Sequence, residues 1–80
     1  MLEAVAICDA LCLSKTALNR QLESLQSTCP DFRFRWASGA ESRLLMKKRH
    51  VKILPCLVIG EIVLYGVPAQ EEILQTWQLQ

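Results

Sequence analysis

The stretch Val51–Trp77, VKILPCLVIGEIVLYGVPAQEEILQTW, decides the fold of this chain of 80 residues. It contains two apolar runs, Cys56–Ile59 and Ile62–Tyr65, which are separated by Gly60 and Glu61. Two short runs divided by two residues, one of them glycine, are the pattern of a β-hairpin with a tight turn. The centre of the stretch therefore predicts a pair of antiparallel strands.

The residues after the hairpin predict a helix. Gly66 ends the second run, and Pro68 suits a first helical turn, because its missing N–H would have no partner there. Two acidic residues follow at positions where negative charge favours the positive end of the helix dipole. The apolar face of this helix is formed by Ile73, Leu74 and Trp77.

On the amino-terminal side of the stretch, we expect a short helix over Glu41–Val51. It carries apolar residues and ends in the basic run Lys47–His50, which is favourable at a helix C-terminus. Ala37–Ala40, which contains serine and glycine, is expected to be a connection. Before it, the aromatic residues of Phe32–Trp36 alternate with two arginines, the pattern of a strand with one covered face.

The chain begins with a short apolar run, Leu2–Ile7, that suits a buried strand. From Asp9 to about Thr28, leucines recur at helical spacing and predict an amphipathic helix. The expected order is β-α-β-α-β-β-α, with the first two strands parallel because a long helix joins them. We therefore predict one α/β domain over residues 1–80, with a mixed four-stranded sheet and three helices.

The composition and charge of the chain limit the classes of function that we expect. Apolar residues make up 51% and charged residues 21%, as in globular proteins. A net charge of +1 and a pI of about 7.7 do not indicate a basic surface of the kind that binds nucleic acid. No apolar stretch reaches the roughly 20 residues of a membrane span. Glu3 stands where a signal peptide would be basic, so we expect a reducing, cytoplasmic setting. The sequence contains no phosphate-binding loop, and we expect no cofactor.

The segment Val51–Trp77 resembles the C-terminal half of thioredoxin-like proteins, including the small thioredoxins and glutaredoxins. It has their order of proline, strand, tight turn, second strand, glycine and acidic helix start. The resemblance implies that the Leu54–Pro55 bond is cis and that Pro55 lies beside redox cysteines at the start of the first helix. Cys8 stands at that position. It also implies a substrate groove formed by Leu54, Pro55 and Cys56.

The cysteine motif departs from the family pattern. The family motif is Cys-x-x-Cys, whereas this chain has Cys8-Asp-Ala-Leu-Cys12, one residue longer. Residues four apart on a helix have Cα atoms about 6 Å apart, near the upper limit for a disulfide. A disulfide therefore requires Cys8 to lie just outside the helix.

These residues predict a small thiol–disulfide oxidoreductase acting on a protein disulfide or thiol. A thiolate at a helix N-terminus is stabilised by free N–H groups and the helix dipole, so Cys8 is the expected nucleophile. Cys12 would resolve the mixed disulfide. The carboxylate of Asp9 disfavours a negatively charged Cys8 thiolate beside it, and the positive charge of Lys15 offsets this effect in part.

Other functions stay open on the sequence. Cys8, Cys12 and Cys56 together would suit a soft metal such as zinc or copper(I), or a metalloid. The domain would otherwise be a redox-inactive module that binds a partner protein. Cys29 is expected to be structural and His50 solvated, and the aromatic strand Phe32–Trp36, if at an edge, offers a homodimer contact.

Overall fold

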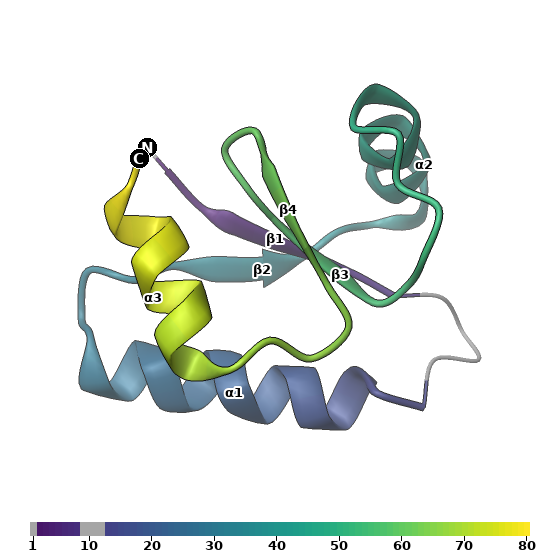
Figure 1. Cartoon of the computed structure of the whole chain (residues 1–80). Coiled ribbons are helices and arrows are strands. Elements are labelled where there is room, and N and C mark those ends of the chain that lie inside the picture. Colours follow the sequence, from purple (N-terminus) through teal and green to yellow (C-terminus); the bar gives the residue numbers. More distant parts are fainter. Residues whose placement is uncertain (1, 9–12) are drawn as a thin grey trace.

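The structure is a computed structural model and describes residues 2–8 and 13–80. These residues form an α/β fold with a mixed four-stranded sheet and three helices (Figure 1). No helix in this part of the chain is long and apolar enough to cross a membrane. The elements are β1 (Ala4–Ile7), α1 (Lys15–Thr28), β2 (Phe34–Trp36), α2 (Gly39–Lys48), β3 (Cys56–Ile59), β4 (Ile62–Tyr65) and α3 (Gln70–Gln78).

The strands lie in the order β2-β1-β3-β4. β1 and β2 are parallel, with Ala6 opposite Trp36, which confirms the prediction made from the connecting helix. β1 and β3 are antiparallel, with Ile7 opposite Cys56, and the β3–β4 hairpin pairs Cys56 with Tyr65. β2 and β4 therefore form the two edges of the sheet.

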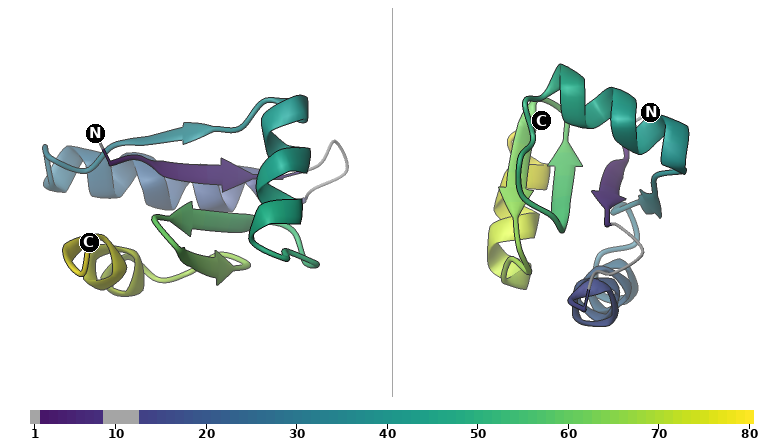
Figure 2. Two further views of the ribbon diagram at one scale, coloured as in Figure 1. Left: turned by 90° about the horizontal axis from the view of Figure 1, so that it is seen from above. Right: turned by 90° about the vertical axis from the view of Figure 1, so that its right-hand side faces the viewer.

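The sheet separates two helical layers, with α1 and α3 on one face and α2 on the other (Figure 2). Strand residues alternate between these layers. In β3, Leu57 and Ile59 pack toward α1 and α3, whereas Cys56 and Val58 pack toward α2. This alternation decides which layer each strand side chain can reach.

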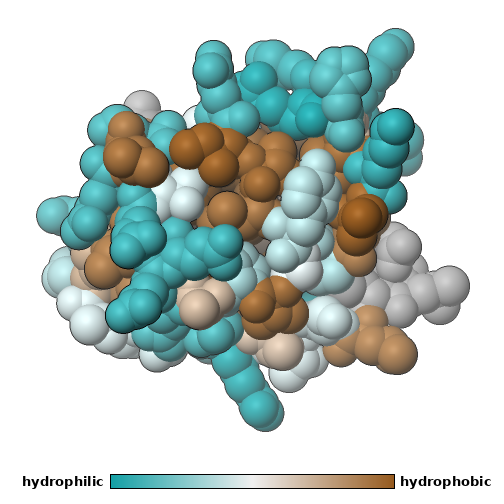
Figure 3. Space-filling model, in the orientation of Figure 1, coloured by the Kyte–Doolittle hydropathy of each residue, from teal (hydrophilic) through white to brown (hydrophobic). Residues whose placement is uncertain are grey.

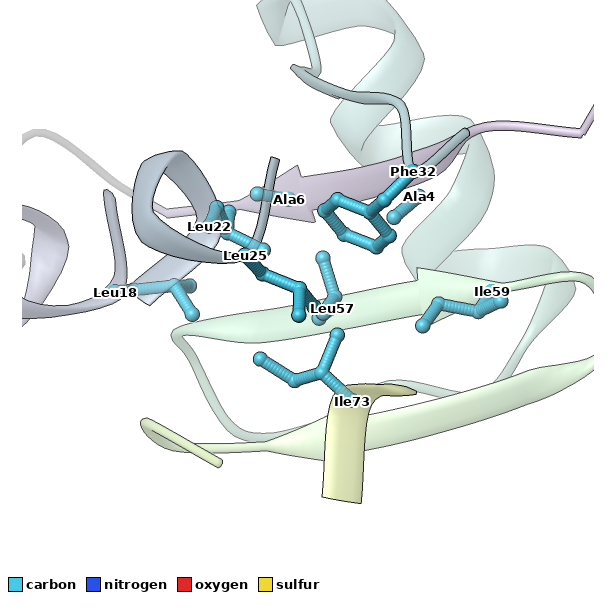
Figure 4. Packing of buried hydrophobic residues seen from close by; sticks show 9 residues of the cluster. All are labelled: Ala4, Ala6, Leu18, Leu22, Leu25, Phe32, Leu57, Ile59 and Ile73. Carbon is cyan, nitrogen blue, oxygen red and sulfur yellow. The ribbon is translucent and has the colours of Figure 1, made fainter. Parts of the chain in front are cut away.

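The larger core cluster lies between the sheet and the α1–α3 layer (Figure 4). The leucines of α1 point toward Leu57 and Ile73, and Phe32 closes the end near Ala4. The ring of Phe32 meets Trp77 edge-on, with centroids 4.9 Å apart. The buried members of this cluster are Ala4, Ala6, Leu18, Leu22, Leu25, Phe32, Leu57, Ile59 and Ile73.

The smaller cluster lies beneath α2. Its buried members are Ile7, Val51, Cys56 and Val58. They are covered by partly buried apolar residues that include Leu45 and Met46 of α2, together with Leu54. Because Ile7 ends β1 and Cys56 begins β3, α2 covers the end of the sheet where β1 finishes.

α2 ends in a Schellman motif that has histidine where glycine is usual. His50 has a φ of 56°, in the left-handed region. The N–H of Val51 donates to the carbonyl of Met46 at 2.8 Å, and the N–H of His50 donates to Lys47 at 3.4 Å. The buried side chain of Val51 then directs the chain back beneath α2.

The structure corrects the boundaries of five elements. β1 begins at Ala4, whereas the apolar run predicted a start at Leu2. α1 begins at Lys15, after Ser14, whereas the leucine spacing predicted a start at Asp9, which lies outside the described residues. β2 begins two residues after Phe32, which instead packs in the core. α2 runs over Gly39–Lys48 because the Ser38 hydroxyl accepts from the Glu41 N–H. α3 begins at Gln70, so Pro68 precedes the helix.

Candidate thiol site at the end of the central strand

Three features meet at one end of the sheet (Figure 1). β1 ends at Ile7 and is followed by Cys8, α1 starts at Lys15, and the cis Leu54–Pro55 bond leads into β3. Ile7 is paired with Cys56 in an antiparallel register. The next residue of β1 and the preceding residue of β3 are Cys8 and Pro55, so extending the register by one residue places them side by side.

The described cysteines differ in their oxidation state. Cys8 is half-buried and disulfide-bonded. Cys29 and Cys56 are free thiols. Cys12, the expected resolving residue, lies outside the described residues, as does Asp9. Cys8, the nucleophile expected from the sequence, lies at the carboxyl end of β1.

The first turn of α1 supplies positive charge near this end. It contains no acidic residue, and the Ser14 side chain makes no capping hydrogen bond. The free N–H groups of such a helix start favour a nearby anion. The ammonium group of Lys15 lies 5.2 Å from the ring centroid of Trp36.

Trp36, which the alternation places on the covered face of its strand, also joins β2 to the start of α1. Its indole Nε1 donates to the Asn19 side-chain oxygen at 2.9 Å, and its ring holds Lys15. The alternation in the sequence correctly gave the face of Trp36. Only the parallel register, which sets Trp36 opposite Ala6, places it near the carboxyl end of β1.

Pro55 is buried, and its carbonyl oxygen accepts the Gly66 N–H at 2.9 Å. This bond joins the residue before β3 to the residue after β4. Gly66 has a φ of 75°, which favours glycine. Leu54 is half-buried and packs against the cluster beneath α2, so much of its side chain is turned away from the surface.

Cys56 does not line a surface groove, contrary to the expectation from the resemblance. Its side chain is 0% exposed and packs with Ile7 beneath α2. Burial raises the pKa of the Cys56 thiol to about 11, so it stays protonated at neutral pH. Strand alternation explains the difference, because position 56 belongs to the face that α2 covers.

Several apolar side chains on the segments near Pro55 are exposed. Ile53, two residues earlier, is 62% exposed, and Tyr65, paired with Cys56, is 48% exposed. Val67 and Leu13 are exposed as well, after β4 and before α1 respectively. These four residues are exposed apolar side chains on the segments that enter or leave the candidate site, and sequence patterning could not separate them from the core.

Comparison with known proteins supports the fold. A solved structure described as "Structure of a malarial protein" superposes with a TM-score of 0.75. The alignment covers 99% of this chain and 96% of that chain at 12% identity. No family model matches the chain, and no curated protein is similar to it. Similarity at this level of identity shows a shared fold.

The remaining candidates lie elsewhere. Cys29 ends α1, where its N–H donates to the Leu25 carbonyl at 2.7 Å, and it packs against the larger core cluster. His50 is exposed at the end of α2. Within residues 2–8 and 13–80, no three His, Cys, Asp or Glu side chains gather as metal ligands would.

Proposed function

We propose that this chain is a thioredoxin-like thiol–disulfide oxidoreductase in which Cys8 is the nucleophile and Cys12 the resolving residue. The observation that carries the proposal is the position of Cys8. It follows the central strand, precedes the helix that starts at Lys15, and lies beside Pro55 in the extended register. A protein disulfide or thiol is the proposed substrate.

The proposed reaction proceeds by thiol–disulfide exchange. The Cys8 thiolate attacks one sulfur of a substrate disulfide, forming a mixed disulfide and releasing the other sulfur as a thiolate that takes up a proton. The Cys12 thiolate then attacks the Cys8 sulfur. This forms the Cys8–Cys12 disulfide and releases the dithiol substrate, so two electrons have passed from protein to substrate.

Lys15 and the N-terminus of α1 favour the thiolate of Cys8 in this scheme. Positive charge and free N–H groups lower the free energy of a nearby thiolate relative to the thiol. The exposed apolar side chains of Ile53, Tyr65 and Val67 would contact the polypeptide on either side of the substrate disulfide. Cys56 takes no part, since its buried thiol faces α2.

The test is a redox titration of the purified domain in glutathione buffers of defined ratio. Free thiols are trapped with a mass tag, and any disulfide is located by peptide mapping. We expect a reversible Cys8–Cys12 disulfide with a potential between about −270 and −120 mV. Cys8→Ser should abolish it, whereas Cys29→Ser, at the other end of α1, should leave the potential unchanged.

Two other outcomes would replace this proposal. Stoichiometric metal bound by the same sample, and lost in Cys8→Ser, would favour soft-metal binding. A domain that forms no disulfide and holds no metal would be a redox-inactive module for a partner protein. Both measurements use the same preparation, so one experiment separates the three functions.

A further inference from the structure

The charge of this molecule is unevenly distributed along the chain. Residues 42–60 contain five of the nine Lys and Arg residues and none of the eight Asp and Glu residues. The rest of the chain therefore has four basic and eight acidic residues, a formal charge of −4. The net charge of +1 is therefore the sum of +5 over residues 42–60 and −4 over the rest of the chain.

The positive charge is concentrated on the outer face of α2. Arg43, Lys47 and Lys48 are exposed there, while Leu45 and Met46 turn toward the sheet. Lys52 is exposed in the segment that leads to Pro55. Hydrophilic side chains gather over α2 at the top of the molecule (Figure 3).

Two large apolar side chains are exposed among these cations. Leu44 of α2 is 66% exposed, and Ile53 lies immediately after Lys52. We call these six residues the basic surface: Arg43, Leu44, Lys47, Lys48, Lys52 and Ile53. Ile53 is followed in the chain by Leu54 and the cis-proline Pro55, so the basic surface ends two residues before Pro55 of the candidate thiol site.

The basic surface has no internal counter-charge. In the described part of the chain, the side-chain ion pairs are those of Arg35 with Glu3 and Glu41. Arg43 and Lys47 are four residues apart on α2, a spacing at which like charges weaken a helix. Arg49 differs from these cations, because it is partly buried and donates to the Gly60 carbonyl at 3.3 Å.

We propose that the basic surface docks an acidic partner protein whose disulfide or thiol reacts at Cys8. This inference rests on the proposed function and adds the partner's chemistry: carboxylates opposite Lys47, Lys48 and Lys52, and an apolar contact at Ile53. Complementary charge raises the association rate and sets orientation. Docking on α2 would bring the reactive sulfur of the partner toward Pro55, at the end of the sheet that α2 covers.

The charge of the opposite layer favours a protein over an extended polyanion. On that layer, exposed Lys15 and Arg20 of α1 accompany the exposed acidic residues Glu23, Glu71 and Glu72, so two basic and three acidic residues give a formal charge of −1. A nucleic acid or an anionic membrane that reached around the molecule would meet no second basic face there. Nucleic-acid-binding domains usually have a pI above about 9, whereas the pI here is about 7.7. A partner protein can present acidic residues to α2 and neutral residues to the rest of this molecule.

The test uses three synthetic peptides with the same internal disulfide, flanked by glutamates, lysines or glutamines. The domain is reduced beforehand and freed of reductant, so that each molecule supplies two electrons once. The product dithiol is trapped and measured. We expect the Glu-flanked peptide to react at least about five times faster than the Lys-flanked one. The ratio should approach one near 1 M salt, where the screening length is about 3 Å.

A matched pair of variants locates the effect. Lys47→Glu combined with Lys48→Glu should remove or invert the preference for the Glu-flanked peptide, with the Gln-flanked peptide reacting as before. Arg20→Glu combined with Arg33→Glu makes the same change in net charge at exposed positions away from α2. That control should keep the preference.

Binding without chemistry separates the two proposals. A fluorescent Glu-flanked peptide with serines for cysteines is titrated by anisotropy. Binding that is lost in the Lys47/Lys48 variant, without reduction of any peptide, supports docking and overturns the redox function. Reduction of all three peptides at equal rates, without this binding, overturns docking and leaves the redox function. Tighter binding of phosphatidylserine vesicles or an oligonucleotide than of the acidic peptide also overturns docking.

Discussion

The thiol of Cys56 lies fully buried between β3 and α2, and its pKa is raised to about 11 by that burial. We predict that iodoacetamide at pH 8 labels Cys29 much faster than Cys56 in the folded protein, because only thiolates react. Peptide mapping after a timed quench measures both rates. Equal labelling in the native state, with Cys56 no more protected than in urea, would contradict this burial.

The same shift gives a pH dependence of stability. The ordinary thiol pKa of 9.0 applies to the unfolded chain, so between pH 9 and 11 the unfolded state loses the Cys56 proton and the folded state keeps it. The stabilisation is therefore complete below pH 9 and falls by about 2–3 kcal/mol up to pH 11. Urea titrations of Cys56→Val should lack this fall, and an identical fall in the variant would exclude Cys56 as its source.

His50 adopts a left-handed conformation that an L-residue with a Cβ enters at a cost of about 1–2 kcal/mol. Glycine avoids the cost but gains freedom in the unfolded chain, so His50→Gly should stabilise the protein by about 0.5–1 kcal/mol. Thermal and urea unfolding measure this. Lys48→Gly, two residues earlier in the helix, should destabilise by about 1 kcal/mol instead.

At the scale of elements, Arg35 of β2 links the segment before β1 to the start of α2. It contacts Glu3 at 3.2 Å and pairs with both carboxylate oxygens of Glu41. The Arg35 hydrogen bond is the main reason that the pKa of Glu41 is lowered from 4.5. The Glu41 contribution to stability is therefore present above about pH 4.5 and is lost as the pH falls through its lower folded value.

Arg35→Gln should reduce the loss of stability between pH 7 and pH 3, because Glu41 then has little pKa shift to contribute. The difference should be small, since the pair is exposed and salt screens it. Urea titrations at both pH values provide the measurement. Arg33 forms no ion pair within the described residues, so Arg33→Gln should behave as the native protein does.

Elements whose signals are local were predicted well from the sequence. The β3–β4 hairpin has the predicted bounds, because Gly60 and Glu61 specify the turn between two apolar runs. The starts of α1 and α2 were wrong, since apolar spacing does not show where a helix begins. At the site, the surroundings of Cys56 and Trp36 depend on register and on the layer that covers each face, which no local pattern contains.

For the whole molecule, stability depends mainly on the larger core cluster. A chain of this length has a total stability of roughly 4–12 kcal/mol. Leu22→Ala should remove about 2–5 kcal/mol of it, because Leu22 is fully buried among α1, the sheet and α3. Leu44→Ala on the outer face of α2 should change stability by less than about 0.5 kcal/mol. Thermal melts of both variants test the contrast.

The two edges of the sheet differ in a way that limits how copies of this chain can assemble. β2 has Arg35 at its centre, held in ion pairs, whereas β4 is uncharged and exposes Ile62 and Tyr65. Charge on an edge strand discourages another strand from adding to it. Two molecules that join antiparallel through β4 leave only their β2 edges outward. Such an assembly would close as a pair through β4, and not through the aromatic strand Phe32–Trp36 that the sequence suggested as a homodimer contact.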